Sequence, residues 1–134
     1  MAVLIDTSVL VASERGSTTL AKLIQPGETY SVSCITAAEL LHGVHRATGR
    51  RAQARSAFVE GILNAFAPLP VDMPVARAYG RASAALAKSG TTVDANDLWI
   101  GATAIAAGME VLALDGDFER IPGLHRTSPS ERTD

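Results

Sequence analysis

The chain has 134 residues, of which 47% are hydrophobic, 19% charged and 4% aromatic. These values predict one globular domain with a core of Ala, Val, Leu and Ile, and they exclude a disordered chain. The formal net charge of −2 excludes a uniformly basic surface that binds nucleic acid through charge alone.

Helices and strands alternate along the predicted chain. The predicted elements, in chain order, are a strand at 3–5, a helix at 9–23 with a break at 15–19, a strand at 30–34, helices at 35–47 and 51–66, a short extended piece at 68–72, helices at 74–90 and 95–108, a strand at 111–114, a short helix at 115–121 and an edge strand at 123–127. Pro74 is typical of a helix start, and Gly90 and Gly108 are typical of helix ends. The alternation predicts an α/β fold, a three-layer α/β/α sandwich with a short parallel central sheet.

We expect a single domain over residues 1–134, in which residues 127–134 form a flexible tail. Cys34 is the only cysteine, so no internal disulfide can form. Its sequence neighbours are small or apolar, and we therefore expect its side chain to be buried. We find no signal-peptide pattern and no run of the ~20 apolar residues that span a bilayer. We therefore expect a cytoplasmic protein with no membrane partner.

Four acidic residues occupy comparable places in the predicted fold. Asp6 directly follows the first strand and Asp115 follows the strand at 111–114, while Glu39 and Asp97 lie in the first turns of two helices. Sites in open α/β sheets lie at the carboxyl ends of the strands, so we expect these acids to meet at one edge.

Each acid also has a purely structural explanation. Asp6 and Asp115 are typical helix N-caps, and Asp94 is a candidate cap for the helix that carries Asp97. The sequence "TAAE" resembles a capping box with Thr36 as the cap. Together, however, the acids would repel one another by several kcal/mol, and a bound divalent cation is the simplest compensation. Oxygen ligands favour Mg²⁺ or Mn²⁺ over zinc. The three histidines lack the spacing of a zinc site, and we expect them to be ordinary surface residues.

The middle of the chain is basic. Between residues 40 and 93 there are seven cations and two acids, a difference of +5. The segment "HRATGRRAQAR" carries four arginines and no acid: Arg46, Arg50, Arg51 and Arg55. A carboxylate-bound metal beside such a segment indicates phosphodiester chemistry, in which arginines hold the flanking phosphates. A solvated helical face is the equally good structural explanation.

The motifs "IDTSVL", "TAAELLHGV", "NDLWIGATAIAAG" and "VLALDGDFERIPGL" resemble those of the PIN-domain ribonucleases, and among them the VapC toxins of bacterial toxin–antitoxin pairs. The resemblance covers nearly the whole chain. It implies an endoribonuclease toxin that depends on Mg²⁺ or Mn²⁺, forms a homodimer and is inhibited by a VapB-type antitoxin. An inactive PIN-like module that binds RNA or protein is the alternative.

The resemblance also implies which residues form the site. The metal-binding acids of the family fall on Asp6, Glu39 and Asp97, and the more variable fourth acid falls on Asp115. Asp94 is the rival for the role of Asp97, and Asp117 is the rival for the role of Asp115. Thr7 and Ser8 match polar positions of the family, where they bond a carboxylate or only cap a helix. The chain departs from the family pattern at Gly101, which we expect to leave room near the site, and at Ala113 and Leu114, where the usual threonine is absent.

Overall fold

The structure, a computed structural model, describes residues 1–132. Its parallel strands form one sheet in the order β3-β2-β1-β4-β5. The strands are β1 (Ala2–Ile5), β2 (Thr29–Ser33), β3 (Pro68–Leu69), β4 (Glu110–Leu112) and β5 (Arg126–Thr127). The helices are α1 (Thr7–Glu14), α2 (Leu20–Leu23), α3 (Cys34–Arg46), α4 (Gly49–Ala65), α5 (Met73–Ser89), α6 (Ala95–Ala107), the 3₁₀ helix η1 (Gly116–Arg120) and α7 (Pro129–Arg132).

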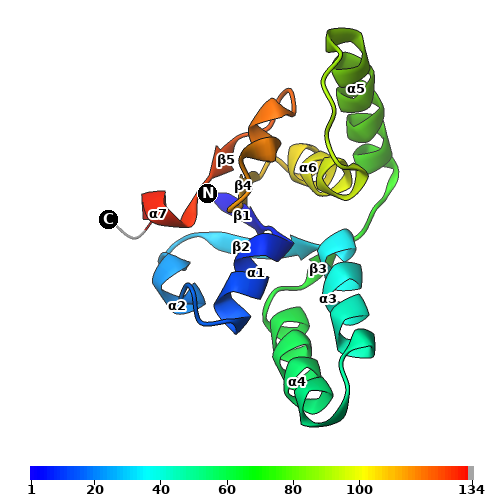
Figure 1. Cartoon of the computed structure of the whole chain (residues 1–134). Coiled ribbons are helices and arrows are strands. Elements are labelled where there is room, and N and C mark those ends of the chain that lie inside the picture. Colours follow the sequence, from blue (N-terminus) through cyan, green and yellow to red (C-terminus); the bar gives the residue numbers. More distant parts are fainter. Residues whose placement is uncertain (133–134) are drawn as a thin grey trace.

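Strand β1 lies at the centre of the sheet and is covered on both faces. Val3 and Ile5 pack in a core with residues of α1, α2, α3 and α4. Leu4 points to the other face and packs with residues of α5, α6 and η1. Figure 1 shows the same division, with α5 and α6 on one side of the sheet and α1, α2 and α4 on the other. Because successive side chains of a strand alternate, an uninterrupted apolar run is what a doubly covered strand requires. The predicted three-layer α/β/α sandwich is confirmed.

Two predicted helix ends are also confirmed. Gly90 follows α5 with φ of 71° and Gly108 follows α6 with φ of 68°, in the left-handed region that glycine adopts without steric cost. Helix α5 begins one residue before Pro74, and Asp72 caps it by accepting a hydrogen bond from Val75 N.

The expected capping box at Thr36 is wrong. Helix α3 starts at Cys34, and Ser33 is its N-cap, with Oγ accepting a bond from Ile35 N at 3.0 Å. Strand β2 passes directly into the helix, so Thr36 is buried within its first turn and Glu39 lies in the second turn, not the first. The prediction that Cys34 is buried is also wrong: as the first residue of α3 it is exposed.

The segment from residue 127 differs from the expected flexible tail. Thr127 belongs to β5, and the side chain of Arg132 is only 6% exposed. Arg132 pairs with Glu28 and with Glu110 at 3.5 Å, and it donates to Tyr30 Oη at 2.8 Å. This ion cluster fastens α7 to the amino ends of β2 and β4; residues 133 and 134 of the expected tail lie outside the described residues. No helix within residues 1–132 is long and apolar enough to cross a bilayer.

Candidate active site

Asp6 lies where β1 ends and α1 begins, and its side chain is 4% exposed. Its Oδ2 accepts hydrogen bonds from Ser8 N at 3.1 Å and from Ser8 Oγ at 2.6 Å. Burial raises the pKa of the Asp6 carboxyl above its ordinary value; the hydrogen bonds from Ser8 oppose that rise, and the charge of Glu39 adds to it. Asp6 is therefore both the cap of α1 and a buried carboxylate that faces another acid.

Glu39 is held from two sides. Thr7 Oγ1 donates to its Oε1 at 2.7 Å, and Asn96 Nδ2 donates to its Oε2 at 3.4 Å. Thr7 Oγ1 also lies 3.0 Å from the hydroxyl of the buried Thr36. Thr7 has one hydroxyl proton, so Glu39, at the shorter distance, and Thr36 compete for it. Thr7 thus bonds the Glu39 carboxylate, and Ser8 bonds the Asp6 carboxylate. Thr7 of α1 and Asn96 of α6 together orient Glu39 of α3.

Asp97, in the first turn of α6, is the electrostatic centre of the edge. Its pKa is raised to about 7, first by burial and then by the charges of Asp6, Asp115, Asp94 and Glu39. The structure therefore brings the four predicted acids to one edge of the sheet, together with Asp94. Such repulsion among neighbouring carboxylates is typical of a metal site or a catalytic site.

Asp97, Asp115 and Asp117 form the tightest part of this edge. Each offers a carboxylate oxygen, and these oxygens lie within 4.8 Å of one another. Asp115 Oδ1 accepts a bond from Asp117 N at 2.8 Å, so Asp115 caps η1, and Asp117 pairs with Arg120 at 2.9 Å. Asp94 caps α6 by accepting from Asn96 N at 3.1 Å. Asp94 and Asp115 are therefore helix caps, as predicted, and they also lie in the acidic cluster.

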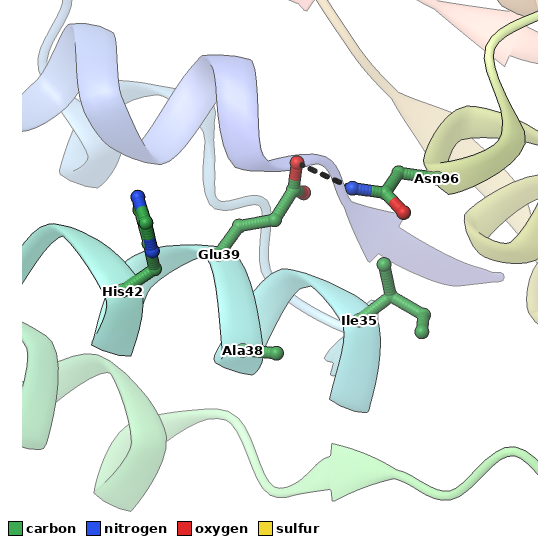
Figure 2. Close-up of a pocket in the computed structure, with 5 residues that line it drawn as sticks. All are labelled: Ile35, Ala38, Glu39, His42 and Asn96. Carbon is green, nitrogen blue, oxygen red and sulfur yellow. Dashed lines mark hydrogen bonds between the residues drawn. The ribbon is translucent and has the colours of Figure 1, made fainter.

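An open hollow of about 540 Å³ adjoins Glu39. In Figure 2, the side chains of Glu39 and Asn96 point toward one another and are joined by a hydrogen bond, and Ile35, Ala38 and His42 lie along the same stretch of α3 as Glu39. A smaller hollow of about 120 Å³ is lined by Glu39 as well, together with Thr7, Glu14, Arg15 and Arg55 among others. Glu39 therefore lines both hollows.

The four predicted arginines do not all lie near the acids. Arg46 lies at the end of α3, and Arg50 and Arg51 lie in the first turn of α4. All three are exposed where α3 joins α4. Arg55 alone lines a hollow that Glu39 shares, and it pairs with Glu14 at 3.3 Å. The histidines are exposed, as predicted.

The expectation that Gly101 leaves room near the site is wrong. A Cβ at Gly101 would lie 2.8 Å from Ile121 Cδ1 and 3.2 Å from Leu124 Cδ2, so the glycine admits the segment after η1 into close contact with α6. Two site neighbours were missed from the sequence. Asn96 stands next to Asp97 in "ND", which could have indicated it. Arg126, which bonds the backbone beside Asp115, has no signal in the sequence.

Three comparisons with known proteins agree with this geometry. The family model described as "PIN domain" matches residues 3–124. Ribonuclease VapC1 of Rickettsia felis is 34% identical over 134 residues, covering 98% of this chain and 99% of that protein. The VapBC-5 structure from Mycobacterium tuberculosis, a member of the VapBC family of toxin–antitoxin systems, has a TM-score of 0.76 at 32% identity and covers 95% of this chain and 96% of that chain. The VapBC2 structure from Rickettsia felis, bound to a promoter DNA fragment, has a TM-score of 0.86 at 22% identity over 96% of this chain and 98% of that chain, which supports the fold.

Proposed function

The chain belongs to the PIN-domain family, and we propose that it is the ribonuclease toxin of a toxin–antitoxin pair, which hydrolyses RNA phosphodiester bonds at its acidic edge. The observation that carries the proposal is the raised pKa of Asp97, about 7, amid the charges of four other acids. Relatives named as VapC ribonucleases match at nearly full length, which favours an enzyme over an inactive binding module. The presence of every expected acid favours the same conclusion.

A divalent cation fits the residues of this edge. Carboxylate oxygens of Asp97, Asp115 and Asp117 converge within 4.8 Å, and the cluster contains no sulfur or nitrogen ligand. Hard oxygen donors suit Mg²⁺, with Mn²⁺ as a substitute. We assign Asp97, Asp6 and Asp115 as the residues that hold it, directly or through water, with Asp117 as the rival to Asp115. When bound, the cation neutralises the acids, lowers the pKa of bound water and stabilises charge on the phosphoryl group.

Glu39 is suited to orient the attacking water. Thr7 and Asn96 each bond one of its carboxylate oxygens, which fixes the plane of the group. In the proposed reaction a water oxygen bonds to phosphorus and the bond from phosphorus to the 3′ oxygen breaks. The water proton passes to Glu39 or to solvent, and the leaving 3′ oxygen takes a proton from solvent. The products are a 5′-phosphate and a 3′-hydroxyl.

We propose that RNA crosses the site along the two hollows beside Glu39. The larger hollow offers the apolar side chains of Ile35 and Ala38 and the ring of His42, which suit an unstacked base. In the smaller hollow, Arg55 is the predicted arginine placed to reach a phosphate next to the cleaved one. Arg46, Arg50 and Arg51 would contact more distant phosphates.

The inhibitor is proposed to be a VapB-type antitoxin, because the VapBC-5 structure belongs to the VapBC family of toxin–antitoxin systems.

The homodimer is a further proposal, which sedimentation of the free chain would test. We place the protein in the cytoplasm, which its single exposed thiol favours.

The experiment incubates total RNA with the purified chain in Mg²⁺, Mn²⁺ or EDTA, and the ends of the fragments are sequenced. We expect discrete cuts that depend on the metal and end in a 5′-phosphate. Asp6→Asn should abolish cutting and keep the fold, because Asn can still accept a bond from Ser8 N. Asp72→Asn, which removes one exposed carboxylate charge at the start of α5 away from the site, is the matched control and should cut normally. RNA that is bound in EDTA and left whole in every metal would support the binding module instead.

A further inference from the structure

We infer that Arg126, on β5, is a positioning residue that holds Asp115 at the metal site. The inference rests on the proposed function. Asp115 ends the short segment that leads from β4 to η1. Ala113 is buried in the core, but Leu114 is 49% exposed, so packing does not fix the backbone directly before Asp115. Polar bonds to this backbone must therefore set the place of Asp115.

Arg126 makes most of these bonds. Its Nε and Nη2 donate to Ala113 O at 3.2 and 3.0 Å, and Nη2 also donates to Leu114 O at 2.9 Å. The side chain is 13% exposed, so water competes little for these bonds. Its partner Glu119 is 64% exposed, and their contact at 3.1 Å therefore contributes little.

Ser8 completes the arrangement from the other side. Its Oγ accepts a bond from Leu114 N at 3.2 Å and donates to Asp6 Oδ2 at 2.6 Å. Both backbone groups of Leu114 are thus fixed, the amide by Ser8 and the carbonyl by Arg126. The Ser8 hydroxyl links the segment to Asp6, so the carboxylates of Asp6 and Asp115 are held in one frame.

The guanidinium group is what the arrangement needs. Two neighbouring carbonyls accept bonds from one planar group with several fixed donors. Lysine has a single rotatable ammonium on a flexible stem and would not reproduce this fork. Partners that orient metal ligands typically change metal affinity by about 10- to 100-fold when they are removed.

The test measures binding of Mn²⁺ alone to the metal-free full chain, from the electron paramagnetic resonance signal of free Mn²⁺, together with kcat and KM for RNA. We expect Arg126→Met to weaken Mn²⁺ binding by about 10- to 100-fold, and Arg126→Lys to recover part of that loss. Glu119→Gln should leave binding unchanged, because it keeps the bonds to the carbonyls.

Arg132→Met is the matched control. It also removes a buried guanidinium group, but at the opposite end of the strands, so it should lower stability and leave Mn²⁺ affinity unchanged. In an Asp115→Asn background, Arg126→Met should weaken Mn²⁺ binding no further, since the ligand it positions is already lost. That non-additivity distinguishes positioning from a general loss of stability.

The outcomes separate the two proposals. A wild type that binds Mn²⁺ and cuts RNA, with Arg126→Met and Arg132→Met equal in affinity, would overturn the role of Arg126 and leave the proposed function standing. If Arg126→Met does not fold, a wild-type affinity in Arg126→Lys together with additivity of Arg126→Lys and Asp115→Asn would overturn it. A wild type that neither binds Mn²⁺ nor cuts RNA would overturn both proposals.

Discussion

Replacing Asp97 by Asn should stabilise the metal-free protein at neutral pH while it removes a proposed metal ligand. Carboxylate oxygens of Asp97, Asp115 and Asp117 lie within 4.8 Å of one another. Two unit charges at that separation repel by ~1 kcal/mol in water and by ~3 kcal/mol at an effective dielectric constant of ~20. Asp97 is partly exposed, so solvent screening keeps the gain between these limits. Loss of the charge from the first turn of α6 costs about 0.3–1 kcal/mol, which leaves a net gain of about 1–2 kcal/mol.

The sign of the pH dependence follows from the direction of the shift. The pKa of Asp97 rises from its ordinary value of 3.8 to about 7 on folding. The folded state therefore binds more protons between these values, and its stability falls as the pH rises from about 4 to 7. Asn cannot titrate, so its advantage over Asp97 should be full above pH 7 and should vanish near pH 4.

The assay is urea unfolding in EDTA, followed by circular dichroism at pH 4 and pH 7.5. Asp72→Asn removes one exposed carboxylate far from the cluster and should change the free energy of unfolding by less than about 0.5 kcal/mol at either pH. Addition of Mg²⁺ should stabilise the wild type more than Asp97→Asn. An Asn variant that is less stable than the wild type at pH 7.5, or whose advantage is the same at both pH values, would refute the reasoning.

Three further predictions concern the neighbours of the site and the core. Gly101→Ala should destabilise the chain by about 1 kcal/mol, because the clash with Ile121 outweighs the better helix propensity of Ala; in an Ile121→Val background, which lacks the clashing Cδ1, urea unfolding should show a stabilisation instead. Thr7→Val removes the bond to Glu39 Oε1 and should lower kcat about 10-fold with little change in KM for RNA, and an unchanged kcat would contradict the orienting role of Thr7. The exposed Cys34 thiol should react with Ellman's reagent in the native protein within minutes, whereas reaction only after unfolding would show that it is buried.

Much of the fold was predictable because its signals are local. The apolar run at residues 3–5, Pro74, Gly90 and Gly108 each report a requirement of the backbone at their own position, and the structure confirms what they predicted. Two of the errors arose where one element joins another without a loop. The direct passage from β2 into α3 moves the cap from Thr36 to Ser33 and exposes Cys34.

The sequence alone determined the order of strands and helices, the acidic residues at strand ends and helix starts, and the chemistry that such carboxylates share. Only the tertiary structure decided which groups meet. It brought Asn96 to Glu39, joined Asp117 to Asp97 and Asp115, left Arg46 far from the acids, and set Arg126 against the backbone beside Asp115. The physical reason is that strand order and helix packing set contacts between residues far apart in the chain. Spacing along the sequence carries no measure of such contacts.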